Sequence, residues 1–189
     1  MKKITLLFLS AGIIVFSAFT LATGKWVSKA AHVNFFSHTD AEDIKADNYK
    51  VVSTLDQATG EIVYSVPMQS FEFEKALMQK HFNSDKFLDT KTYPKAKFKG
   101  KITNLSEINF SKDGTYNTTV TGEMTIKATT KTVTEKGTIT ISGSATKVSA
   151  KTKFKIVLAD YGVAFEKGKP ASNISKTVDV TVNAEYSPE

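Results

Sequence analysis

Apolar and polar residues alternate along most of the chain, which is the pattern of β-strands with one buried and one exposed face. In residues 95–102 every second position is a lysine, and the positions between hold Ala, Phe, Gly and Ile. The alternation recurs over residues 116–128, 133–143, 150–158 and 178–184. Residues 31–37, 49–55 and 61–73 also have the composition of strands, and Pro67 predicts a bulge or an edge position in the last of these. The pattern predicts a mostly β protein.

A single helix is predicted between the strands, over residues 74–81. Its sequence contains good helix formers, and Leu77, Met78 and His81 are spaced to share one face that would cover the sheet. A short turn at residues 84–88 continues the connection, with Ser84 as its predicted N-cap.

The predicted sheet, of about eight strands, has one apolar face that must be buried. A sandwich of two sheets and a closed barrel both satisfy this requirement. Glycines at inward positions indicate sharp bends or space left for another molecule, and they are Gly100, Gly122, Gly137 and Gly143. An eight-stranded barrel is just wide enough to hold one small ligand. The pattern therefore favours an all-β antiparallel barrel over a sandwich.

The N-terminal 22 residues have the layout of a secretory signal peptide. Lys2 and Lys3 precede a long apolar run that ends at Ala22. We therefore expect cleavage after Ala22 and an exported domain spanning residues 23–189. A retained membrane anchor is the alternative interpretation of the same segment.

Composition excludes several classes of chemistry. The chain contains neither cysteine nor arginine, so disulfides, thiolate metal sites, cysteine nucleophiles and arginine clamps on phosphate are ruled out. Removal of the predicted signal lowers the formal net charge from +6 to +4, because that segment holds two lysines and no acids. Such a mildly basic exported chain is not expected to bind nucleic acid. Rows of lysines at 95–101 and 147–155 are typical of solvated strand faces, and they could also contact anionic membrane surfaces.

Specific motifs resemble the YceI-like family. They are Val66–Asn83, Ser84–Asp89 and Tyr93–Gly100, with weaker similarity in Val120–Ile126 and Asp160–Val163. The order of the parts also matches, because a serine and aromatic segment precedes the helix and a Tyr-Pro pair opens the next strand. The chain departs from the family pattern in lacking the arginines usual before the helix and before the Asp-Tyr-Gly turn.

The resemblance implies an extended, lipocalin-like, eight-stranded antiparallel barrel that holds a polyisoprenoid chain, such as a quinone tail or prenyl lipid. It implies a carrier or store in the periplasm or outside the cell, as a monomer or homodimer, with the lipid as ligand and no other cofactor. Such a site needs length and apolar walls rather than a catalytic constellation. The residues expected to line it are Phe71, Phe73, Leu77, Met78, Phe82, Phe87, Tyr93, Phe98, Ile102, Val120, Met124, Ile126, Phe154 and Ile156.

We also expect the helix and residues 84–93 to lie at one mouth of the barrel. Met78, Phe82 and Tyr93 would then contact the ligand head group or act as a gate.

Other functions remain as alternatives. A structural or adhesive surface module would have a solid core instead of a cavity. An isomerase or cyclase acting on a lipid would require a pair of polar groups converging inside the lumen. A metal site built from His32, His38 and His81 is disfavoured, because the first two lie about 20 Å apart along an extended strand.

Overall fold

The computed structural model describes residues 24–163, 165–166, 169–170 and 174–189. The predicted signal peptide, residues 1–22, lies outside the described residues. Among the residues that are described, no helix has the length and hydropathy needed to cross a membrane.

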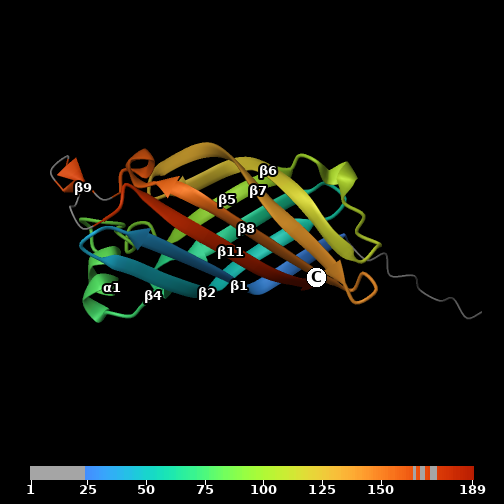
Figure 1. The fold of residues 1–189 in the computed structure, drawn as a ribbon, viewed down its shortest axis with the longest axis horizontal. Helices are drawn as coiled ribbons and strands as arrows, with labels where there is room; N and C mark the ends of the chain where they lie inside the picture. The colour runs from blue at the N-terminus through green and yellow to red at the C-terminus, as the bar shows by residue number, and fades with distance from the viewer. Residues whose placement is uncertain (1–23, 164, 167–168, 171–173) are drawn as a thin grey trace, which may run out of the picture.

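Nine strands form one antiparallel sheet. They are β1 (Lys25–His38), β2 (Asp43–Asp56), β3 (Glu61–Pro67), β4 (Glu72–Phe73), β5 (Lys95–Ile102), β6 (Gly114–Ile126), β7 (Thr129–Ser142), β8 (Lys147–Val157) and β11 (Thr177–Pro188). Their order is β1-β11-β8-β7-β6-β5-β3-β2, and β1 also pairs with β2. Eight strands therefore close into a barrel (Figure 1), with the short β4 added beside β2. The predicted all-β, lipocalin-like barrel is confirmed.

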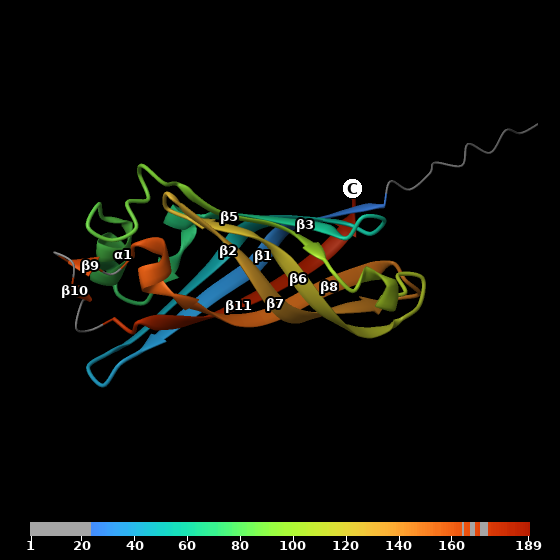
Figure 2. The same ribbon diagram turned by 90° about the horizontal axis from the view of Figure 1, so that it is seen from above.

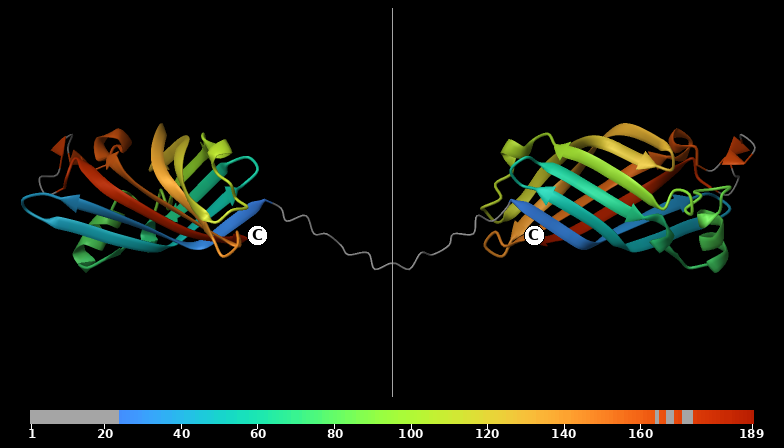
Figure 3. Two further views of the ribbon diagram at one scale, coloured as in Figure 1. Left: turned by 45° about the vertical axis from the view of Figure 1, so that its right-hand side comes forward. Right: turned by 180° about the vertical axis from the view of Figure 1, so that it is seen from behind.

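The remaining elements are short and gather mainly at one end. Helix α1 (Ala76–Asn83) and the β9–β10 hairpin (Phe165–Glu166 and Lys169–Pro170) lie at this end, whereas the C-terminus lies at the other (Figures 2 and 3). Three 3-10 turns complete the described chain: η1 (Met68–Ser70), η2 (Leu105–Glu107) and η3 (Leu158–Tyr161). The expectation that the helix sits at one mouth of the barrel agrees with this arrangement.

Long strands give the barrel its extended form. β1, β2 and β7 have 14 residues each, about 46 Å if fully extended. Along β11 the buried residues Val178, Val180 and Val182 alternate with partly exposed ones, as the sequence pattern predicts for a strand with one inner face. Strands with this alternation place one apolar wall around a common interior.

The segment 61–73 is not the continuous strand that its composition predicts. β3 ends at Pro67, the chain then makes turn η1, and Glu72–Phe73 pairs with β2 as the separate strand β4. Proline has no backbone N–H to continue a ladder. The Asn48 side chain, which donates a hydrogen bond of 2.8 Å to the Pro67 carbonyl, holds the chain where it leaves the sheet.

Helix α1 begins two residues later than predicted and ends two residues later. Ser84 ends the helix instead of starting a second one, since its hydroxyl donates a 2.7 Å hydrogen bond to the His81 carbonyl. The predicted N-cap role of Ser84 is therefore wrong.

Two aspartates stabilise turns at the end opposite α1. The Asp56 carboxylate accepts hydrogen bonds from the N–H groups of Ala58 and Thr59, at 2.8 and 3.0 Å, and so orders the β2–β3 turn. Asp113 does the same for the β7–β8 turn by accepting from the N–H groups of Ser144 and Ala145. These contacts fix the turn geometry at this end.

Of the glycines predicted to lie inward, Gly143 is instead exposed in the β7–β8 turn, with a φ of +66°, and the other three allow close approach of strands rather than leaving space. Gly100 on β5 pairs with Gly122 on β6, and a Cβ on Gly122 would lie 2.3 Å from Gly100 Cα and 2.4 Å from the Lys99 carbonyl oxygen. The space above Gly100 holds the Phe98 ring. Side chains would not fit at this pair, so the sheet can bend sharply here.

We predict that Gly122→Ala destabilises the fold by at least about 2 kcal/mol, because the added methyl meets backbone atoms that cannot move aside. Urea unfolding followed by circular dichroism measures the change. Gly24→Ala is the matched control, since its Cβ would meet nothing closer than 3.8 Å. Equal stability of the two variants would contradict the close approach.

Candidate functional site

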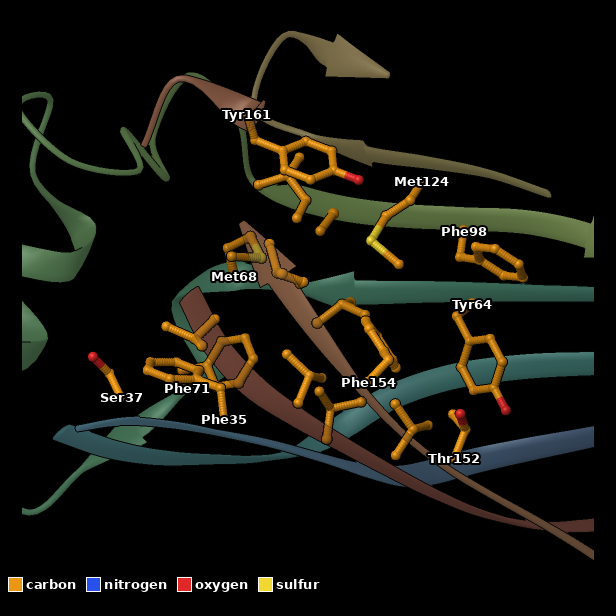
Figure 4. A pocket seen from close by; sticks show the side chains of 18 of the residues that line it. Phe35, Ser37, Tyr64, Met68, Phe71, Phe98, Met124, Thr152, Phe154 and Tyr161 are labelled. Carbon is orange, nitrogen blue, oxygen red and sulfur yellow. The ribbon is translucent and has the colours of Figure 1, made fainter. Parts of the chain in front are cut away.

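The barrel encloses an elongated cavity of about 590 Å³. This volume lies within the range of about 300–1,000 Å³ found for small-molecule sites. Figure 4 shows side chains from several elements directed into it, among them Phe35, Met68, Phe71 and Phe154. The interior is therefore not filled by side chains from end to end, and its walls are mainly apolar.

Nearly all of the residues predicted to line a cavity do so. The structure places around it Phe71, Phe73, Leu77, Met78, Phe82, Phe87, Phe98, Ile102, Val120, Met124, Ile126, Phe154 and Ile156. They come from the residue after η1, from β4, α1, β5, β6 and β8, and from the loop after the helix, so the fold brings distant segments together.

Tyr93 is the exception, and its predicted place at the mouth is wrong. It borders a separate shallow depression formed with Thr92, Pro94, Lys95 and Lys97. Thr125 and Lys127 also border this depression, and Lys95 and Thr125 stand at the outward phase of β5 and β6, so Tyr93 packs on the outer side of this wall rather than in the lumen.

A cluster of phenylalanines lines the cavity at the α1 end. Phe82 of the helix is buried at its centre, with ring centroids 4.9 Å from Phe73, 5.5 Å from Phe71, 5.7 Å from Phe35 and 6.3 Å from Phe87. These rings connect the helix to strand β1 and to the β4 segment. The cluster holds α1 across this end of the barrel.

The outer rim of this end is more exposed. Leu77 is 63% exposed and His81 is also exposed, whereas Met78 is half-buried, and all three border the cavity. An ion pair of 3.1 Å between Lys75 Nζ and Glu42 Oε1 links the base of the helix to the β1–β2 turn. The rim therefore combines an exposed apolar side chain with an ion pair that joins the helix to the β1–β2 turn.

Hydroxyl groups lie at the opposite end of the cavity. The Tyr186 hydroxyl donates a 3.1 Å hydrogen bond to the Tyr64 hydroxyl and shares a second, of 2.7 Å, with Ser53 Oγ. Burial raises the pKa of Tyr64 and, more strongly, that of Tyr186. Both tyrosines therefore stay protonated and supply hydrogen bonds rather than charge.

Two further polar side chains border the lumen between the ends. Glu135 occupies an inward position on β7, and burial raises the pKa of its carboxyl group. Tyr161 in η3 is 4% exposed, and the pKa of its hydroxyl is raised by burial and by the nearby charges of Asp160 and Glu135. These two residues were not among the expected lining, and neither were Val33, Phe35, Tyr64, Met68 and the inward valines of β11.

Metal binding has no support in the part of the chain that is described, which holds no group of three His, Asp or Glu side chains able to share an ion. His32 instead forms a 2.8 Å contact with Asp47 and stacks on Tyr49 with ring centroids 4.4 Å apart. His38 pairs with Asp43 at an exposed position. These two histidines therefore have partners other than a metal.

These features define a β-barrel protein with an apolar internal cavity. A sequence model of the YceI-like domain matches residues 18–186, and the chain therefore belongs to the YceI-like family. No curated protein matches the chain in sequence.

Solved structures share the fold at low sequence identity. A polyisoprenoid binding domain from Saccharophagus degradans, implicated in plant cell wall breakdown, has a TM-score of 0.72 and 15% identity over 88% of this chain and 99% of that one. BcnA from Burkholderia cenocepacia gives 0.68 and 20%, over 82% and 95%. The YceI protein of Campylobacter jejuni gives 0.56 and 18%, over 100% and 99%. At these identities the likeness establishes the fold.

We predict that Phe82→Ala lowers the free energy of unfolding by about 3–5 kcal/mol, because it leaves a hole at the centre of the ring cluster. Leu77→Ala on the same helix is the matched control and should change stability by less than about 0.5 kcal/mol, since Leu77 is largely exposed. Differential scanning calorimetry on both variants tests this. Similar losses in the two would show that α1 is not anchored through Phe82.

Proposed function

We propose that this protein is an exported lipid-binding protein that holds a polyisoprenoid, or a similar long apolar chain, inside its barrel. The observation that carries the proposal is the 590 Å³ apolar cavity inside a barrel closed by long strands. A polyprenyl chain has almost no hydrogen-bonding groups, so apolar walls that exclude water are what it needs. The polyisoprenoid-binding description of the Saccharophagus degradans domain supports the same ligand class.

The energetics of such binding are favourable. Burial of each methylene contributes about 0.8 kcal/mol, so a few isoprene units provide micromolar affinity after ordering costs of several kcal/mol. Affinity of this kind grows with the length of chain that the cavity accepts. We therefore propose carriage or storage of the lipid rather than chemical conversion, with no cofactor beyond the lipid itself.

We place this activity in the periplasm or outside the cell, in the bacterial envelope. The signal-peptide pattern of residues 1–22 supports that location. A surface module with a solid core is the alternative, and the cavity weighs against it.

The direct test combines extraction with a variant that fills the cavity. Native mass spectrometry of protein purified from its own host should show a bound mass, and organic extraction should release a prenyl lipid. Ala150→Trp places a large ring in the lumen and should reduce lipid occupancy at least about tenfold, whereas Lys153→Trp, exposed on the outer face of the same strand, should leave it unchanged.

Two results would contradict the proposal. Protein that carries no lipid and takes up none from vesicles would favour the solid-core module. Recovery of the added lipid in a chemically altered form would show an enzyme instead of a carrier.

We further propose that the lysine rows provide transient contact with anionic membranes. The row of Lys95, Lys97, Lys99 and Lys101 lies exposed along the outside of β5, and its first member follows the loop after α1. Each lysine near an anionic surface contributes about 1 kcal/mol of attraction. Lipid could then pass between the bilayer and the nearby mouth.

We predict that changing these four lysines to glutamate weakens binding to vesicles containing anionic lipid by at least about tenfold. Co-sedimentation measures the bound fraction, and vesicles of neutral lipid alone serve as the control. Unchanged co-sedimentation with anionic vesicles would exclude this row as the contact surface.

A further inference from the structure

Tyr161 presents a polar group to an otherwise apolar wall. The residue lies in η3, at the end of β8 nearest α1, where Gly162 turns the chain with a φ of +64°. Its ring is buried, and Figure 4 shows its hydroxyl pointing into the cavity on the side of Met124. Among the described residues this hydroxyl has no hydrogen-bond partner. The donor is therefore available to a molecule in the lumen.

Glu135 provides an acceptor on the same side of the cavity. Its position on β7 is inward, because Val133 and Gly137 at the same phase are partly buried while Thr134 and Lys136 between them are exposed. Within the described part of the chain, no hydrogen bond or ion pair holds its carboxyl group. Strand β7 packs against η3, where Lys131 Nζ lies 2.8 Å from Asp160 Oδ1, and Glu135 lies four residues further along the same face of β7. The charge of Glu135 also raises the pKa of the Tyr161 hydroxyl. Donor and acceptor thus share one region of the lumen.

This arrangement is unfavourable for a ligand made only of hydrocarbon. A bare hydrocarbon that displaces water from the lumen would leave both groups buried without partners, which costs free energy. A ligand with a polar group at this level would supply those partners. The same apolar walls can then hold the rest of its chain.

We propose that Tyr161 and Glu135 form a polar subsite in the lumen that binds an uncharged hydroxyl group, of an alcohol or a phenol, carried by the apolar ligand. The proposal rests on the proposed function and specifies its ligand. The Tyr161 hydroxyl donates to the ligand oxygen, and the ligand hydroxyl donates to the Glu135 carboxylate. A hydroxyl satisfies both groups because it donates and accepts at one atom.

The charges around the subsite exclude anionic head groups. Glu135 acts on Tyr161 as a negative charge, whereas the charge of Asp160 is offset by its 2.8 Å ion pair with Lys131 Nζ. Lys97, Lys136 and Lys151 border the cavity, but their side chains are exposed on the outer phase of their strands, and Lys75 at the mouth pairs with Glu42. A phosphate or carboxylate placed at Tyr161 would therefore meet the charge of Glu135, and Lys131 beside it already pairs with Asp160.

The first test compares three ligands with the same chain of four isoprene units: the alcohol, the hydrocarbon and the carboxylic acid. Displacement of a fluorescent lipid probe from the wild-type protein measures their affinities at neutral pH. The alcohol should bind about 3- to 10-fold more tightly than the hydrocarbon, and the acid should bind more weakly than the alcohol.

The second test uses variants that keep the shape of the wall. Tyr161→Phe removes the donor and should lower alcohol affinity about 3- to 10-fold while leaving hydrocarbon affinity unchanged. Glu135→Gln removes the charge and should raise the affinity of the acid. Tyr93→Phe and Glu123→Gln are the matched controls, because Tyr93 lies outside the cavity and Glu123 is exposed on β6.

The outcomes separate the subsite from the wider proposal. Equal binding of alcohol and hydrocarbon, or equal effects of Tyr161→Phe on both, would overturn the subsite while the lipid-binding function stands. Failure of all three ligands to bind would overturn the function and the subsite with it. Thermal unfolding checks that the variants fold, and if one does not, the wild-type comparison of the three ligands decides.

Discussion

Closure of the sheet between β1 and β2 is the constraint on which the cavity depends. An open sheet of the same strands would leave its apolar face exposed to water, or would fold that face onto itself and leave no cavity. β1 pairs with β11 and with β2, and its register shifts between Val27 and His32 on one side and around Ala31 on the other. Such irregularities bend a strand and increase its twist. Half-way round the barrel, the close pair of Gly100 and Gly122 allows a second bend, so the sheet curls around a space.

The two ends of this space differ in chemistry, which gives a bound chain a preferred direction. Phe82 and the rings around it form an apolar wall under α1, beside the mouth, and the hydroxyls of Tyr64, Tyr186 and Ser53 satisfy one another at the opposite end. Because these hydroxyls already have partners, they gain little from binding a ligand. Tyr161 and Glu135, whose polar groups have no hydrogen-bond partner among the described residues, instead lie on the side of η3, near the mouth. A ligand hydroxyl would therefore stay near the mouth while its chain extends inward.

Much of this fold follows from sequence pattern, because strand alternation reports directly which side chains share a face. The lining of β5, β6 and β8 was predictable for that reason, and the motif around Phe71–Phe82 indicated the helix that covers one end. Pro67 indicated an irregularity in the sequence, but the separate strand β4 and the outward position of Tyr93 were not predictable, since both depend on contacts between distant segments of the finished barrel. Glu135 was not predicted for another reason. An acidic residue at an inward position breaks the apolar alternation, and an exposed strand with an irregular pattern has the same sequence appearance.

The apolar walls of the lumen provide affinity for a ligand chain, and the polar groups of the lumen add specificity for its head group. Each buried methylene contributes about 0.8 kcal/mol and a single hydrogen bond about 1 kcal/mol net, so the length of the chain determines affinity. Length does not distinguish two lipids with the same tail. Specificity is a difference of affinities, and it can come from groups that penalise the wrong head as well as from those that bind the right one. In the proposed subsite, Tyr161 attracts a ligand hydroxyl, and the charge of Glu135 disfavours an anionic head group. A cavity with apolar walls can thus discriminate between lipids that share the same chain but differ in the head group.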